Sequence, residues 1–180
     1  DAEAEGDDEN AGETGLARLL SSGPIFYVLM LCAVVVGSYF RAPLLGRSLW
    51  NDEEYAMRRY AHGSYEAGDE GKKAFKPVTW TNTLAENDNG NNHLLHSVLS
   101  RTSLAAWHRI NNKPAEEFSE TALRLPSFIA ALLTLILVGI IGWECGLPWV
   151  GAGAAWLLAL HPWHIRYSVE AKGYSLMLFF

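Results

Sequence analysis

The sequence predicts an all-α, polytopic integral membrane protein, and three observations lead to this fold class. Of its 180 residues, 49% are hydrophobic and 19% are charged, a balance that excludes a disordered chain. Three stretches lack Asp, Glu, Lys and Arg over about the length that spans a bilayer, for which roughly 20 residues are needed. The net charge is −6, whereas nucleic-acid binding requires a basic face, so we expect no nucleic-acid partner.

Residues 1–18 are expected to form an acidic, solvated tail, because seven acids and no Lys or Arg fall within the first 13 residues. Residues 19–40 predict the first transmembrane helix, with Pro24 at its apolar start and Arg41 directly after it. A secretory signal peptide is the competing interpretation. Its leading region is basic, whereas this one is acidic, which favours a retained helix.

Two further spans are predicted at residues 122–143 and 147–165, and a fourth begins at 173–180. We expect the chain to be truncated within this fourth span, since it stops inside an apolar run. Small residues near Gly151 favour close packing of the third span against a neighbour. The regions before the second span and after the third are separated by two crossings, so both are expected on the same side of the membrane.

Residues 41–121 form a long polar region that carries 10 of the 14 basic residues. Two helices are predicted within it, at 52–61 and 93–110, separated by an irregular loop at 63–92 that is rich in Gly, Asn, Asp and Lys. An apolar stripe on the second helix indicates either a helix on the membrane surface or packing against the loop. The stripe consists of Leu95, Val98, Leu99 and Ala106.

Three carboxylates, Asp52, Glu53 and Glu54, directly follow Asn51 at the predicted start of the first surface helix. Asn is a good N-cap, and acids are favoured in a first helical turn. From the residues alone, a helix start is therefore a better explanation than a reactive site. A functional interpretation needs an additional observation.

That observation is a resemblance carried by several short motifs in order. From about residue 24 onward, the chain resembles the N-terminal part of the GT-C glycosyltransferases, and is most similar to the protein O-mannosyltransferase and aminoarabinose-transferase branch. The matching motifs are Leu49-Trp50, Asp52-Glu53, Asn92-His93, Leu123-Arg124, Pro126-Ser127, His161-Pro162, Tyr167-Ser168, Glu170-Ala171-Lys172 and Tyr174.

The resemblance implies a GT-C-like helix bundle in the plasma (inner) membrane, with a cytoplasmic N-terminus and the 41–121 loop outside the cytoplasm. It implies transfer of a sugar from a polyprenyl-phosphate donor to an acceptor hydroxyl of a protein, lipid or glycan, with inversion. Asp52 is then the general base, acting through its position. Glu53 would orient either Asp52 or a metal ion.

Positive charge is needed for the phosphate that leaves, and Lys172 and Arg166 lie beside Glu170 near the end of the third predicted span. Relatives of the GT-C type commonly have Arg where this chain has Lys172, so a point-charge contact is expected in place of a bidentate one. The alternatives are that both basic side chains reach lipid headgroups, or that Glu170 and Lys172 form a structural pair.

A divalent metal, Mn, Mg or Zn, is a further expectation, with His93 and Glu53 as ligands. For His96, His161 and His164 an interfacial location is favoured over metal binding. The alternative function is a non-enzymatic transporter or metal-binding membrane subunit, and a structural scaffold is a third. No ionisable residue lies in the middle of a predicted span, which disfavours transport.

Overall fold

The computed structural model describes residues 5–67 and 72–180, without the side chains of residues 5–22 and 89, and helices make up 72% of it. Residues 1–4 of the predicted acidic tail lie outside the described residues, and the backbone of the rest belongs to the first helix. The main helices are α1 (Glu5–Arg41), α2 (Asn51–Ala56), α3 (Trp80–Ala85), α4 (Leu94–Asn111), α5 (Glu120–Glu144), α6 (Pro148–Leu160), α7 (Pro162–Ser168) and α8 (Tyr174–Phe179).

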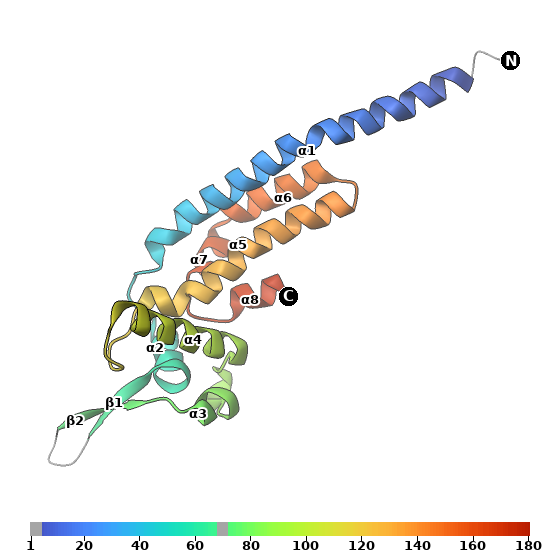
Figure 1. The fold of residues 1–180 in the computed structure, drawn as a ribbon. Coiled ribbons are helices and arrows are strands. Elements are labelled where there is room, and N and C mark those ends of the chain that lie inside the picture. Colours follow the sequence, from blue (N-terminus) through green and yellow to red (C-terminus); the bar gives the residue numbers. More distant parts are fainter. Residues whose placement is uncertain (1–4, 68–71) are drawn as a thin grey trace.

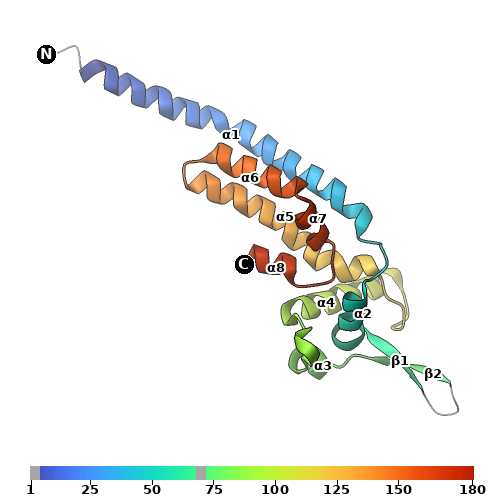
Figure 2. The same ribbon diagram turned by 180° about the vertical axis from the view of Figure 1, so that it is seen from behind.

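Helices α1, α5 and α6 pack side by side, and the polar elements gather at the end of this group where α1 stops and α5 begins (Figures 1 and 2). Glycines allow α5 and α6 to approach closely: a Cβ atom added to Gly142 would lie 2.4 Å from the Cα of Gly151. Met30 of α1 fills the space beside Gly139 in the same way. Close packing at Gly151 was expected from the sequence.

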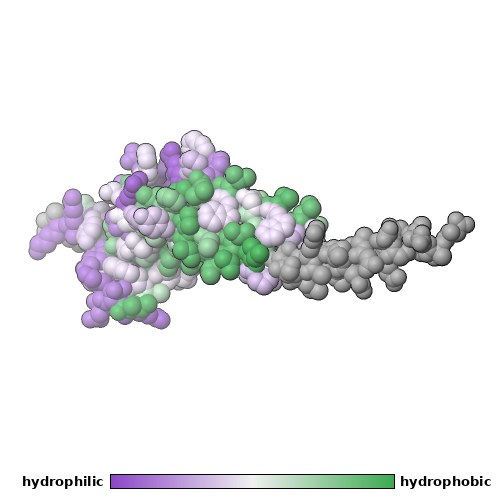
Figure 3. Space-filling model, turned by 90° about the horizontal axis from the view of Figure 1, so that it is seen from above, coloured by the Kyte–Doolittle hydropathy of each residue, from purple (hydrophilic) through white to green (hydrophobic). Residues whose placement is uncertain are grey.

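Within the described residues, two helical segments, Gly23–Leu44 and Glu120–Glu144, are long and apolar enough to cross a membrane. Only 22% and 33% of their most apolar windows are buried, whereas the core helix of a soluble protein is mostly buried. Figure 3 shows the result: hydrophobic residues cover the middle of the molecule, and hydrophilic residues gather at one end.

Residues 147–165, predicted as one continuous span, form two helices instead. α6 has 13 residues, about 20 Å of helix, which is shorter than the roughly 30 Å hydrocarbon core. It ends because His161 adopts an extended conformation with φ −67° and ψ 122° before Pro162, as residues preceding proline prefer. The prediction of a single helix here is corrected to a short apolar helix followed by α7.

The described residues of the loop predicted to be irregular at 63–92 lie mostly in helices and strands, and they add a hairpin to a fold predicted as all-α. β1 (Gly63–Ala67) and β2 (Lys73–Pro77) form an antiparallel hairpin in which Tyr65 lies opposite Phe75, with their ring centroids 5.5 Å apart. Gly63 begins the hairpin at φ +138°, where a Cβ atom would collide with the backbone of β2. Cross-strand aromatic contacts therefore stabilise a hairpin that has little buried core.

The two predicted surface helices are present as α2, extended by the π-helical turn η2 (Met57–Ala61), and as α4. The buried face of α4 is not its apolar stripe: His96, Ser97, Ser100 and Leu104 are buried, whereas Leu95 is 48% exposed. The polar residues are satisfied internally, as when the Ser100 hydroxyl donates to the Leu123 carbonyl at 2.8 Å. The short helices η1 (Ala42–Leu44) and η4 (Asp88–Gly90) complete the described elements.

Candidate functional site

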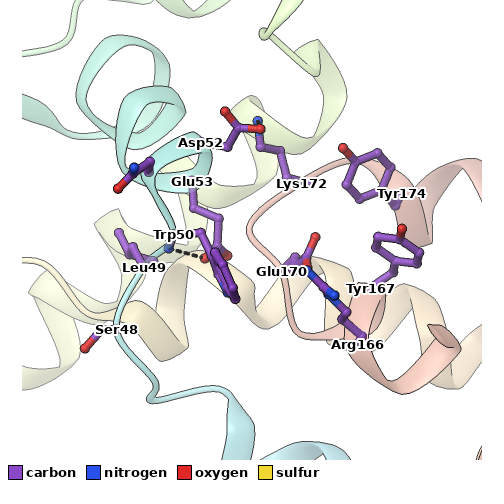
Figure 4. Close-up of a pocket in the computed structure, with 11 residues that line it drawn as sticks. Ser48, Leu49, Trp50, Asp52, Glu53, Arg166, Tyr167, Glu170, Lys172 and Tyr174 are labelled. Carbon is purple, nitrogen blue, oxygen red and sulfur yellow. Dashed lines mark hydrogen bonds and ion pairs between the residues drawn. The ribbon is translucent and has the colours of Figure 1, made fainter. Parts of the chain in front are cut away.

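A cavity of about 640 Å³ opens between the start of α2 and the segment from α7 to α8 (Figure 4). Five residues predicted from the sequence as functional line this one cavity: Asp52, Glu53, Arg166, Glu170 and Lys172. The first two come from α2 and the other three from a segment more than a hundred residues later. The fold therefore brings the two sets of charged residues together in one cavity.

The start of α2 explains why two adjacent carboxylates have different environments. Trp50 precedes the helix in an extended conformation, and its N–H donates to Glu53 Oε2 at 2.9 Å, which closes the first turn. The carboxylates do lie in a first helical turn, but the helix starts one residue earlier than expected, because Trp50 and not Asn51 is the N-cap. The neighbouring Asp52 side chain points the other way and is 81% exposed.

Glu53 is held in a buried ion pair with Arg124 from the first turns of α5, and both side chains are at most 3% exposed. Arg124 donates from Nη2 to Oε2 at 2.7 Å and from Nε to Oε1 at 3.0 Å. The backbone N–H of Ala171 also donates to Oε1. Burial alone would raise the pKa of Glu53, but the hydrogen bonds from Arg124, Ala171 and Trp50 lower it below its usual value.

The metal site predicted from Glu53 and His93 does not fit this geometry. Both carboxylate oxygens of Glu53 already accept hydrogen bonds, two of them from Arg124. His93 precedes α4 and packs against Gly173 and the ring of Tyr174, 5.6 Å away between centroids. Across residues 5–67 and 72–180, no group of three His, Cys, Asp or Glu side chains is arranged to hold a metal ion.

Lys172 is the most buried cation of the cavity, with a side chain that is 3% exposed. Its Nζ lies 4.0 Å from Asp52 Oδ2 and donates a hydrogen bond to Asn91 Oδ1. Figure 4 shows Asp52 and Lys172 turned toward each other at one end of the cavity. Burial lowers the pKa of Lys172, and the nearby carboxylates of Asp52, Glu53 and Glu170 oppose this shift.

Arg166 and Glu170 line the opposite part of the cavity as an i, i+4 ion pair, with 3.2 Å between Nε and Oε1. Glu170 therefore pairs with Arg166, which differs from the structural pairing with Lys172 considered above. The Arg166 guanidinium lies 5.5 Å from the ring centroids of both Trp50 and Trp163. At 51% exposure, Arg166 combines an accessible positive charge with aromatic surface.

Two of the histidines predicted to be interfacial are buried within the protein. His96 is 4% exposed against Ser100, and His164 is 6% exposed and accepts a hydrogen bond from Arg41 at 2.7 Å. Both have internal hydrogen-bond partners, which makes their burial tolerable. His161, in contrast, is exposed.

Arg41, Asn91 and Arg124 have structural roles that the sequence reasoning did not assign. Arg41 is fully buried and donates to the Ala159 carbonyl at 2.8 Å and to Ser168 Oγ at 2.9 Å, which ties the end of α1 to α6 and α7. A charge bordering an apolar span must find a partner, so the positions of Arg41 and Arg124 beside predicted spans were the available signal. The polar turn around Asn91 carries no such signal in the sequence.

Comparison with known protein families, curated proteins and solved structures gives no match for this chain.

Proposed function

We propose that the protein is a multi-pass glycosyltransferase of the plasma (inner) membrane that moves a sugar from a polyprenyl-phosphate donor to an acceptor hydroxyl on the extracytoplasmic face. One observation carries the proposal. An exposed carboxylate, Asp52, and a buried cation, Lys172, face each other at 4.0 Å in a cavity lined by aromatic and cationic groups. Sugar transfer from a phosphate needs a general base and a positive charge within one site.

The reaction assigned to this cavity is a single in-line displacement at the anomeric carbon. Asp52 accepts the proton of the acceptor hydroxyl as its oxygen forms a bond to C1. The bond between C1 and the phosphate oxygen breaks, and polyprenyl phosphate leaves with the electron pair. Lys172 and Arg166 stabilise the negative charge on that phosphate, and configuration at C1 is inverted.

An apolar groove supports a lipid-linked donor. About 900 Å³ of space lies between α4, α5 and α8, and Leu99, Ile129 and Phe179 are among the residues that line it. Leu176 of α8 lines the same groove, only two residues after Tyr174 of the charged cavity. An isoprenoid chain could occupy the groove while its phosphate lies near Lys172, because burying apolar chain surface is favourable.

The test compares wild-type and Asp52→Asn protein in membranes that contain the full-length chain. Labelled polyprenyl-phosphate sugars are supplied as a panel, and release of polyprenyl phosphate is followed over time. We expect the variant to lose roughly 10²- to 10⁴-fold in rate, the usual contribution of a general base. The Asp52 side chain is 81% exposed, so protein levels are expected to stay equal.

Glu54→Gln is the matched control, since Glu54 lies in the same helix, pairs with Arg58 at the surface and does not line the cavity. It is expected to release polyprenyl phosphate at the wild-type rate. Equal rates for wild type and Asp52→Asn would remove Asp52 as the base. If the wild type consumes none of the donors, the transferase proposal itself is refuted.

A further inference from the structure

The cavity of about 640 Å³ between α2 and α7–α8 is called the main cavity here. Lys172 owes its position to a residue outside it. Its ammonium group donates to the amide oxygen of Asn91, which belongs to the turn after η4, more than 80 residues earlier in the chain. Asn91 is not among the residues that line the main cavity. It lines a second cavity of about 430 Å³, which also includes Asp52.

The turn that presents Asn91 is anchored on both sides. The Asn92 amide donates to the carbonyls of Thr83 at 2.9 Å and Glu86 at 2.6 Å. On the other side, the Tyr60 hydroxyl accepts the Asp88 N–H at 2.8 Å, and Arg59 forms an ion pair with the Asp88 side chain. Asn91 itself bonds back to the Asp88 carbonyl at 3.2 Å. These bonds limit how far the Asn91 amide can move.

The Asn91 side chain offers Lys172 a neutral hydrogen-bond acceptor. A buried ammonium needs hydrogen-bond acceptors, and a carboxylate at this place would supply one but neutralise the positive charge. An amide oxygen accepts the hydrogen bond and leaves the net charge of Lys172 unchanged. The ionisable groups around Lys172 are Asp52 and Glu53 of α2, Glu170 of the preceding turn, and His93 and His96 at the start of α4.

We propose that Asn91 is a positioning residue for the donor phosphate: its amide oxygen holds the Lys172 ammonium group beside Asp52 without neutralising it. This inference rests on the proposed function, because the retained charge matters only if an anion binds in the main cavity. Without the Asn91 contact, the buried ammonium group loses a hydrogen-bond acceptor, so its charged form becomes less favourable. The anion site would then be weakened.

The experiment compares Asn91→Ala and Asn91→Asp with wild type in membranes containing the full-length protein. Trace acetylation with acetic anhydride at a series of pH values, followed by mass spectrometry of the Lys172 peptide, reports the titration of this amine without any turnover. Labelling of the exposed Lys76 is the internal reference for reagent reactivity. Donor release is measured on the same membranes with the labelled polyprenyl-phosphate sugars.

The two variants are expected to shift Lys172 in opposite directions. Loss of an acceptor in Asn91→Ala lowers the Lys172 pKa further, and the added carboxylate in Asn91→Asp raises it. The pH at which donor release declines on the alkaline side should move in the same direction as the Lys172 pKa in each variant. We expect the KM for donor to rise on the order of tenfold in Asn91→Asp, because a charge-assisted contact to phosphate is weakened.

Asn87→Ala controls for a loosened turn. Asn87 accepts the Asn92 N–H at 3.0 Å but does not contact Lys172, so this variant should leave the Lys172 titration unchanged. Equal titration in all variants, or shifts of the same sign in Asn91→Ala and Asn91→Asp, would overturn the inference. If the wild type consumes no donor, the proposed function fails and the role in phosphate binding fails with it, while the labelling still decides whether Asn91 sets the charge of Lys172.

Discussion

Removal of the Glu53 carboxylate is expected to destabilise the protein far more than removal of its neighbour Glu54. In Glu53→Ala, the Arg124 guanidinium stays buried at 3% exposure and keeps only carbonyl partners, at Leu45 and Ser48 among others. Breaking one side of a buried ion pair costs about 3–5 kcal/mol. The Glu54–Arg58 pair is 42% and 57% exposed, and such helical surface pairs contribute about 0.3–0.5 kcal/mol.

Thermal unfolding in detergent micelles measures this difference. With about 2–4 °C per kcal/mol, Glu53→Ala is expected to lower Tm by roughly 6–20 °C, and Glu54→Ala by no more than about 2 °C. A double-mutant cycle with Arg124→Ala isolates the pair, because the second substitution costs little once its partner is gone. Equal Tm losses for Glu53→Ala and Glu54→Ala, or strict additivity in the cycle, would contradict the buried-pair reasoning.

The same pair makes stability depend on pH. The pKa of Glu53 is lower in the folded protein than in the unfolded chain, where a Glu titrates at about 4.3. Its contribution is therefore complete above the unfolded pKa and is lost as the pH falls through the folded value. The acid-induced decrease in Tm should be smaller in Glu53→Ala than in wild type below about pH 4.

Two further predictions concern residues outside the cavity. Burial lowers the pKa of His96 to about 3, so the unfolded chain takes up a proton near pH 6.5 that the folded protein does not. Stability is therefore expected to decrease as the pH falls from about 6.5 toward 4. Over this range, Tm should fall less in His96→Leu than in wild type. Gly142→Ala places a Cβ atom 2.4 Å from the Cα of Gly151 and should cost about 1–3 kcal/mol, measured as lower Tm. Gly153→Ala, with nothing within 4 Å, should instead raise Tm slightly, because Ala favours a helix over Gly.

The sequence indicated which charged segments would meet, but not how each side chain would be used. The apolar stretches between Asp52 and Lys172 predicted only a shared side of a membrane, and the contact between the two side chains comes from the fold. The partners of Glu53 could not be read in the same way, because Arg124 and Ala171 are distant in sequence and meet it only after α5 and α7 have packed. A helix-start motif and a buried ion pair have the same local sequence.

Periodicity was least informative where polar residues are buried or strands are short. The apolar stripe of α4 left open whether it faces a membrane surface or the loop, and it did not indicate that Ser97 and Ser100 are buried, where Asn92 and Leu123 supply acceptors. The hairpin was missed since Tyr65 and Phe75 are isolated aromatics in polar stretches. The break between α6 and α7 had a readable signal in Pro162, which was outweighed by the apolar character of its surroundings.

The bond from the Ala171 N–H to Glu53 joins the residue after Asp52 to the residue before Lys172. The spacing between the Asp52 carboxylate and the Lys172 ammonium group thus depends on a buried contact between their chain neighbours as well as on the Asn91 bond to Lys172. Exposed wall residues such as Trp50 can change without altering that spacing. The shape of the cavity wall and the spacing between Asp52 and Lys172 therefore depend on separate sets of residues, so the wall can be redesigned while that spacing is kept.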